Sequence, residues 1–126
     1  MSSPSLDAGV EVQEAAGAVS RLLDSALGFF VWAAHFLVVY IAAAVACQLG
    51  LGATSVSSRV TFLSVLVIMT AAAVTIVVLH AVRRYRELSG LPAQRFRMWI
   101  TIGGDAIATV AIAWQLFPIL LVPVCA

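Results

Sequence analysis

The chain contains no lysine, and only 10% of its 126 residues are charged. Its seven basic residues are therefore all arginines, and they do not cover one face as a nucleic-acid-binding surface requires. The sequence also lacks a glycine-rich phosphate loop, a CxxC metal motif and a recognisable Ser/His/Asp triad. We therefore expect no nucleic-acid partner, no soluble small-molecule substrate and no catalytic residue in this chain.

Apolar residues, in contrast, are abundant. Hydrophobic residues make up 63% of the sequence, and the mean hydropathy is +1.08. A soluble domain of this size cannot bury so much apolar surface, so the expected solvent is a bilayer. Three apolar runs, residues 26–48, 60–82 and 98–122, each exceed the ~20 residues that a helix needs to cross the hydrocarbon. Because lipid offers the backbone no hydrogen bonds, the sequence predicts an all-α integral membrane protein, with three transmembrane helices over residues 26–126.

The two loops between these runs differ in charge. The first, LGLGATSVSS, has one flanking arginine, whereas the second, RRYRELSGLPAQRFR, holds a single glutamate and five arginines: Arg83, Arg84, Arg86, Arg95 and Arg97. Short arginine-rich loops stay cytoplasmic, so we expect the N-terminus inside and the C-terminus outside a bacterial cytoplasmic membrane. The arginines are expected to set this topology and to lie near lipid headgroups. Three aromatic side chains then fall near the inner membrane interface: Trp32, Tyr85 and Trp99.

Residues 1–25 form the predicted cytoplasmic tail. Residues 1–9 are expected to be disordered, but apolar residues recur at helical spacing over residues 10–23, which predicts a short amphipathic helix. Its polar face carries Glu11 and Glu14, whereas helices on lipid surfaces favour lysine and arginine there. If the helix forms, we expect it to contact protein.

Two polar residues lie deep inside predicted spans. Counted at 1.5 Å per residue from the inner ends of the spans, His35 lies about 13 Å deep and Asp105 about 10 Å deep. A carboxylate at such a depth usually faces a partner or a water-filled cavity. Small residues beside Asp105 would let the first and third helices approach closely: Gly103, Gly104, Ala108 and Ala111. The sequence therefore predicts a His35–Asp105 hydrogen bond or ion pair that joins these helices.

Functional roles for these groups remain open beside that structural one. His35 and Asp105 are a candidate pair for proton transfer, with His80 and Tyr85 as an inward continuation. Haem ligation by His35 and His80 is disfavoured, because the two imidazoles differ by about 9 Å in predicted depth. We therefore expect no cofactor, and we favour an interhelical contact as the role of His35.

The outer ends of the first and third spans each carry a cysteine, Cys47 and Cys125. The topology brings both thiols to the oxidising side, so a disulfide and a pair of free thiols are both open interpretations. No histidine or methionine accompanies them, so no metal site is expected. Pro118 and Pro123 should kink or end the third helix.

Two groups of residues resemble small three-span membrane proteins encoded beside haem–copper cytochrome c oxidases. One is Trp32-x-x-His35-Phe36 followed by Tyr40 and Cys47; the other is the closing set Trp114, Pro118, Pro123 and Cys125. The resemblance covers the first and last spans and little of the middle one. It implies an accessory or assembly role near a respiratory enzyme, with no catalytic residue to transfer.

Three functions from different classes follow. The first is a non-catalytic accessory or assembly subunit that packs against larger integral membrane subunits, with a respiratory terminal oxidase as the expected complex. The second is a small homo-oligomeric transporter or channel that uses His35 and Asp105. The third is a haem- or quinone-binding membrane protein. Because three helices with almost no domain outside the membrane enclose no substrate pathway alone, we favour the first.

Overall fold

The protein is all-helical in the computed structural model, which describes residues 4–50, 55–121 and 125, with side chains from residue 8 onward. Five α-helices and one short 3-10 helix follow one another along the chain, and no strand occurs in these residues. They are α1 (Pro4–Ser25), α2 (Leu27–Gln48), α3 (Val56–Leu88), η1 (Pro92–Gln94), α4 (Arg95–Trp114) and α5 (Leu116–Leu121).

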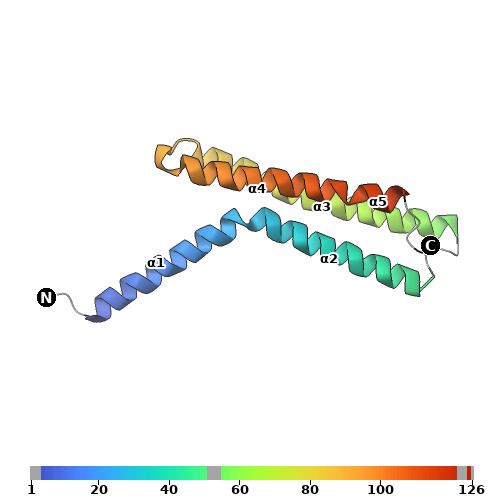
Figure 1. The fold of residues 1–126 in the computed structure, drawn as a ribbon, viewed down its shortest axis with the longest axis horizontal. Helices are drawn as coiled ribbons and strands as arrows, with labels where there is room; N and C mark the ends of the chain where they lie inside the picture. The colour runs from blue at the N-terminus through green and yellow to red at the C-terminus, as the bar shows by residue number, and fades with distance from the viewer. Residues whose placement is uncertain (1–3, 51–54, 122–124, 126) are drawn as a thin grey trace.

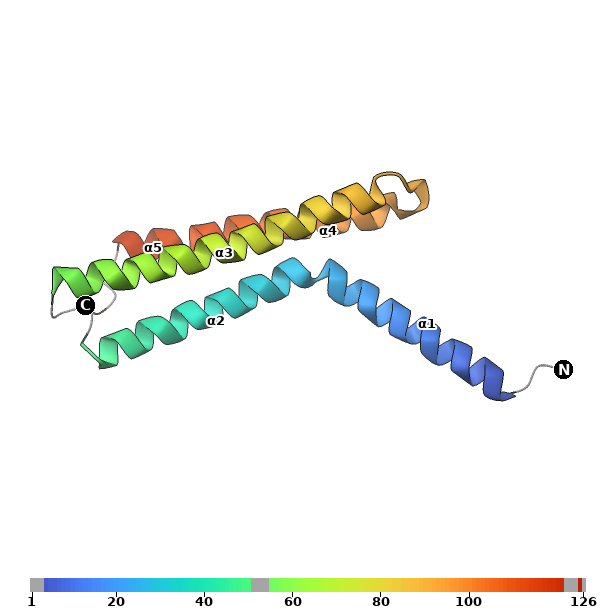
Figure 2. The same ribbon diagram turned by 180° about the vertical axis from the view of Figure 1, so that it is seen from behind.

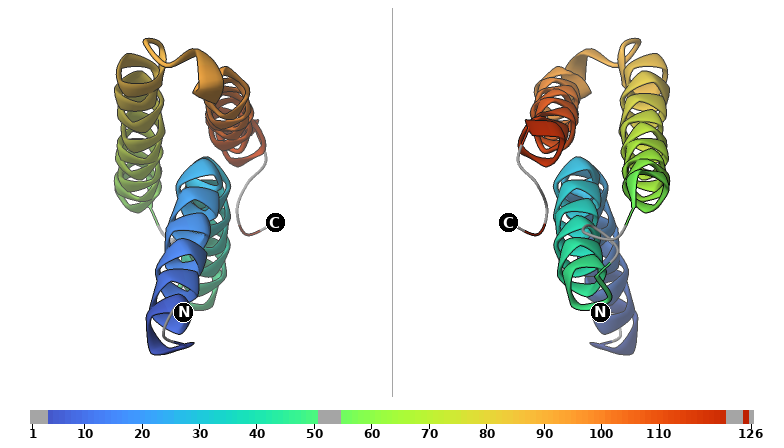
Figure 3. Two further views of the ribbon diagram at one scale, coloured as in Figure 1. Left: turned by 90° about the vertical axis from the view of Figure 1, so that its left-hand side faces the viewer. Right: turned by 90° about the vertical axis from the view of Figure 1, so that its right-hand side faces the viewer.

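Helices α2, α3 and α4 form a three-helix bundle. Figures 1 and 2 show α3 running antiparallel to α2 and α4, and Figure 3 shows the three helices end-on at the corners of a triangle. Three segments are long and apolar enough to cross a membrane: Leu27–Gln48, Val56–Leu88 and Pro92–Leu121. The prediction of three membrane-spanning helices is therefore confirmed, and the chain is suited to a multi-pass membrane protein.

Helix α1 is longer than the sequence suggested. It begins at Pro4, so residues 4–9, expected to lack structure, are helical. Proline suits the first turn of a helix, where its missing N–H is not needed. At Ala26 the chain bends sharply into α2, and α1 then points away from the bundle (Figure 1). We call this bend the elbow, and the end of the bundle beside it the elbow end.

Helix α3 is the longest element. Its 33 residues span about 50 Å at 1.5 Å per residue, well beyond the ~30 Å of membrane hydrocarbon. It begins at a cap in which the Ser55 hydroxyl accepts a hydrogen bond from the backbone N–H of Ser58 at 3.2 Å. It ends at Leu88, six residues beyond the predicted boundary at 82. Much of the predicted arginine-rich loop is therefore helical.

Pro118 interrupts the third span, as the sequence predicts. Because Pro118 has no N–H, it cannot donate to the carbonyl of Trp114, and its ring crowds that carbonyl. Helix α4 accordingly ends at Trp114, and α5 starts again at Leu116. The span predicted as one helix over 98–122 is thus two helices. Pro123 lies outside the described residues.

A small apolar core lies between the helices. Val77 and Ile112 are fully buried, and Ala73 and Ala108 complete the cluster. Trp32, predicted at the membrane interface, packs partly against it. Most other large apolar side chains of α2, α3 and α4 are exposed on the outside of the bundle, as lipid-facing helices require.

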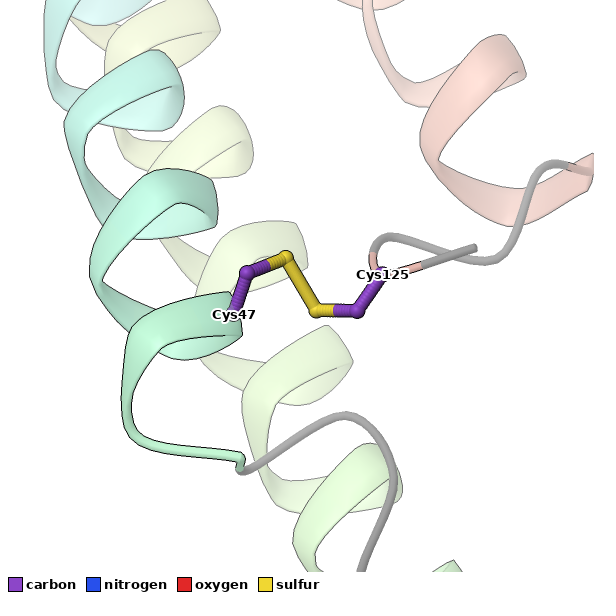
Figure 4. Close-up of a disulfide and its surroundings, with 2 residues drawn as sticks. All are labelled: Cys47 and Cys125. Carbon is purple, nitrogen blue, oxygen red and sulfur yellow. A yellow bond between two sulfur atoms is a disulfide. The ribbon is translucent and has the colours of Figure 1, made fainter.

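A disulfide joins Cys47, near the end of α2, to Cys125, near the C-terminus (Figure 4). The two Cα atoms are 5.4 Å apart, and 78 positions separate the cysteines in the sequence. The sequence left open whether these cysteines form a disulfide or are free thiols, and the structure contains the disulfide. It ties α2 to the segment after α5, and we call this end of the bundle the disulfide end.

Candidate intramembrane polar site

At the elbow end, five charged or titratable side chains from three helices converge. We call them the elbow cluster: Asp24 of α1, His80 and Arg84 of α3, and Arg97 and Asp105 of α4. His80 is at the centre. Its Nδ1 lies 2.8 Å from Asp105 Oδ2, and its Nε2 lies 3.3 Å from Asp24 Oδ1. The imidazole therefore bridges two carboxylates that are 81 residues apart.

Donor counting shows that this arrangement holds a proton. Both ring nitrogens of His80 face carboxylate oxygens, which only accept when ionised, so both contacts need a proton. The doubly protonated imidazolium meets this need. A neutral imidazole meets it as well if Asp105 carries the proton and donates to Nδ1. In either case a hydrogen bond joins His80 Nδ1 and Asp105 Oδ2 across 2.8 Å.

Asp105 is the most constrained member of the elbow cluster. It is 1% exposed, and its Oδ1 has no hydrogen-bond partner among the described residues. The first turn of α2 comes so close that a Cβ added at Gly28 would clash with Oδ1 and lie 3.2 Å from the Asp105 Cα. Only glycine permits this approach of α2 to α4. A buried carboxylate is costly unless paired, so its contact with His80 must hold.

Asp24 connects the elbow cluster to α1. It accepts hydrogen bonds from Arg84 and, at 3.1 Å, from Arg97 Nη2. Burial works to raise the pKa of Asp24, but the hydrogen bonds and positive charge of Arg84 and His80 outweigh it. The pKa of Asp24 therefore lies below its ordinary value of 3.8. Beside it, the Thr101 hydroxyl donates to Ser25 Oγ at 3.3 Å, which gives the elbow a second tie to α4.

A second polar group lies nearer the disulfide end. We call it the His35 cluster: His35 of α2, Thr70 of α3 and Gln115, which follows α4. His35 Nδ1 is 2.9 Å from Gln115 Oε1, and Nε2 is 3.0 Å from Thr70 Oγ1. The Thr70 hydroxyl donates to the Leu66 carbonyl at 2.8 Å. If the Gln115 amide turns to present its NH2 to Nδ1, a neutral ring satisfies every contact.

The predicted His35–Asp105 pair does not form. Gly28 lies against Asp105, and His35 follows Gly28 by seven residues, or about 10 Å along α2. The prediction placed the start of the first span at the membrane surface, whereas α2 begins level with Asp105. Because α3 continues to Leu88, His80 lies eight residues before the end of its helix rather than two, and it meets Asp105 instead.

The small residues beside Asp105 take their predicted role in part. Ala108 lies where α2 and α4 approach most closely, because a Cβ added at Gly28 would be 3.3 Å from the Ala108 Cβ. A Cβ at Gly103, in contrast, would meet nothing within 4 Å. Gly28 was missed because a lone glycine at the start of an apolar run is no signal by itself.

An apolar layer separates the two polar clusters. Thr70 and His80 are ten residues apart on α3, about 15 Å at the helical rise, and the fully buried Val77 and Ile112 lie in the core between them. A hydrogen bond spans only about 3 Å. The single chain therefore offers no continuous hydrogen-bonded route from one cluster to the other through its described residues. Both nitrogens of each imidazole are also engaged, so iron ligation would displace one contact at each ring.

The remaining predicted residues divide by environment. Arg84 and Arg97 are used inside the elbow cluster, beyond their predicted role in topology. Three arginines are exposed at the elbow end, without an ion pair to any side chain that the structure describes: Arg83, Arg86 and Arg95. Tyr85 and Trp99 are also exposed there, at 56% and 66%. Three members of the two clusters were not predicted from the sequence: Asp24, Thr70 and Gln115. Nothing in the sequence marks these residues beyond their being polar.

We predict that Gly28→Ala destabilises the bundle. The added methyl group collides with Asp105, and overpacking of this kind typically costs about 1–3 kcal/mol. Gly103→Ala is the matched control, since its methyl group meets open space and should stabilise the helix by about 0.5–1 kcal/mol. Thermal unfolding in detergent measures both variants. Equal midpoints for the two alanine variants would contradict the close approach at Gly28.

A double-mutant cycle distinguishes the observed pair from the predicted one. Alanine substitutions at His80 and Asp105 should couple by about 0.5–3 kcal/mol, because the two side chains contact each other. Substitutions at His35 and Asp105 should be additive within about 0.5 kcal/mol, as expected for separated sites. The free energy of unfolding of each single and double variant gives both values. Strong coupling between His35 and Asp105, without coupling between His80 and Asp105, would support the predicted pair instead of the observed one.

The contribution of Asp24 to stability should depend on pH. Its pKa is lower in the folded protein, so its stabilisation is complete above the ordinary value of 3.8 and is lost as the pH falls through the lowered pKa. At neutral pH, Asp24→Asn should lower stability by about 1–3 kcal/mol, whereas the exposed Glu11→Gln should change little. Unfolding midpoints between pH 7 and pH 3 test this. If the difference in unfolding midpoint between the unsubstituted protein and Asp24→Asn stays constant down to pH 3, an ionised Asp24 is not the source of the stabilisation.

Comparison of the chain with protein-family models, with curated proteins and with solved structures found no match. The function is therefore inferred from the geometry of this chain.

Proposed function

We propose that this protein is a non-catalytic accessory or assembly subunit of a larger membrane complex. The observation that carries the proposal is the apolar layer of Val77 and Ile112 between the elbow cluster and the His35 cluster. Among the residues that the structure describes, the polar side chains within the bundle hold its own helices together and line no continuous route across it. Such a chain suits packing against other membrane subunits better than chemistry or transport of its own.

The proposed complex is a respiratory terminal oxidase of the bacterial cytoplasmic membrane. This proposal is supported by the resemblance to small proteins encoded beside such oxidases. The residues that carry the resemblance lie in α2 and from the end of α4 to the C-terminal cysteine. In this proposal the elbow end is cytoplasmic, because five arginines gather there and short arginine-rich segments remain inside. The disulfide end then faces the oxidising side, where a disulfide is maintained.

The surface of the bundle supports a packing role. Only 11–17% of the residues in the most apolar window of each span are buried within the chain. Lipid covers such a surface as well as protein does, so exposure alone does not choose between them. Helix α1, however, is held out at the elbow end with apolar side chains exposed, where a partner can reach it (Figure 2).

A homo-oligomeric proton transporter is the second candidate, and one observation favours it. His80 and Asp105, which lie 2.8 Å apart inside the bundle, are side-chain types that can exchange a proton. Transport would need a second copy to bypass the apolar layer, since one chain does not connect its two clusters. This candidate therefore depends on an assembly that places His80 and Asp105 beside a subunit interface.

The test is purification of the tagged protein from its native membrane in mild detergent, with an absorption spectrum and mass spectrometry of the same fraction. We expect larger oxidase chains in the eluate, with haem absorbance that follows those chains. Asp105→Asn, which keeps the shape of the side chain, should leave this co-purification intact. A colourless homo-oligomer that loses proton flux in Asp105→Asn would instead support the transporter and reject the accessory subunit.

A further inference from the structure

An apolar stripe runs along α1 and is left uncovered. Five of its residues, all exposed, are Ala8, Val12, Ala15, Val19 and Leu22, and Ala26 at the elbow continues the series. Val12 and Leu22 are each 70% exposed, and Val19 is 55% exposed. Large apolar side chains exposed in a row on one helix mark an interaction surface.

The elbow fixes the direction in which this stripe faces. Asp24 lies roughly 160° around the helix from the centre of the stripe, at 100° per residue. Through Asp24, α1 is tied to Arg84, Arg97 and His80 of the bundle. The anchored face and the apolar stripe are therefore on nearly opposite sides of α1, and the stripe is presented outward.

The spacing of the stripe is that of a coiled coil. Intervals of four, three, four, three and four residues separate its members, which is the alternation of a and d positions in a heptad repeat. Valine occupies two of the three a positions, 12 and 19, with Ala26 as the third, while Ala8, Ala15 and Leu22 occupy d. The valines at a and Leu22 at d are the residue types that favour two parallel strands at these positions. We propose that the stripe pairs with the same stripe of a second copy of this chain, forming a parallel two-stranded coiled coil.

The charges of α1 fit this occupant. In a parallel pair, Glu11 flanks the seam opposite Ala16 of the second copy, so no like charges face each other. Glu14 and Arg21 lie away from the seam. A lipid surface is a poorer occupant, because anionic headgroups attract basic helices and repel a polar face that carries Glu11 and Glu14.

The membrane supplies the orientation and much of the affinity. Two copies with the same topology direct their α1 helices away from the bilayer on the same side, which gives parallel strands. A helix of 22 residues is about 33 Å long, and a pair of this size falls at the low end of stable interfaces, near 1,200 Å² in total. Anchoring in one membrane raises the effective concentration of each helix for the other, so a small seam suffices.

Cysteine cross-linking in native membranes tests the pairing. Val12→Cys and Val19→Cys lie on the seam, and Gln13→Cys and Ser20→Cys are their matched controls on the polar side. The native cysteines are in a disulfide, so a bismaleimide should not link the unsubstituted protein. We expect covalent dimers with Val12→Cys and with Val19→Cys, and loss of the dimer band with both controls. With a bismaleimide spacer shorter than the ~10 Å between positions 12 and 19, cross-linking at both positions indicates parallel strands, because an antiparallel pair brings at most one residue directly opposite its own copy.

A second substitution tests whether the cross-linked dimer depends on the apolar seam. Val19→Glu should abolish the dimer formed by Val12→Cys, because it places two carboxylates in the seam, whereas Ser20→Glu should leave it unchanged. Equal cross-linking at all four positions, no cross-linking, or links only to a different protein would each overturn the proposal. Co-purification of larger chains is a separate readout, so the coiled coil and the accessory role can succeed or fail independently.

Discussion

The structure depends on how one buried carboxylate is accommodated. Asp105 lies almost wholly inside the bundle, where an isolated negative charge is prohibitively unfavourable. Its neutralisation requires His80 on α3 at the same level, and its close contact with α2 requires a glycine at position 28. These two requirements set the register of all three spanning helices. His80 then reaches Asp24, so the same interaction also sets where α1 leaves the bundle.

The spans could be predicted from the sequence, but the register between them could not. Three apolar runs longer than a bilayer leave little choice of architecture, and Pro118 has a known local effect on the helix that contains it. The predicted depth of each polar side chain, in contrast, depends on where its span begins, and the predicted span ends differ from the observed helix ends. Helix α3 extends six residues past its expected end, and α2 starts at the level of Asp105. Each shift exceeds one helical turn, which is enough to exchange His35 for His80 as the partner of Asp105.

Both polar clusters join the helices of the bundle, but they do so with different side chains. The elbow cluster contains arginine and aspartate side chains near one end of the bundle, where other arginines are exposed, and the His35 cluster contains a histidine, a threonine and a glutamine nearer the disulfide end. Asp24 was the least predictable member. It belongs to a segment that looked like a tail, and only the elbow folds it back onto α3 and α4.

The disulfide has a consequence for chain integrity. Because it links position 47 to position 125, everything from the end of α2 to the C-terminus is a closed covalent ring that contains α3 and α4. A protease that cuts once within this ring, for example in the turn between α3 and η1, opens the ring without releasing a fragment. The nicked protein keeps its three spans as one covalent unit until it meets a reductant. Membrane surveillance that extracts severed helices would therefore have to break a sulfur–sulfur bond as well as a peptide bond.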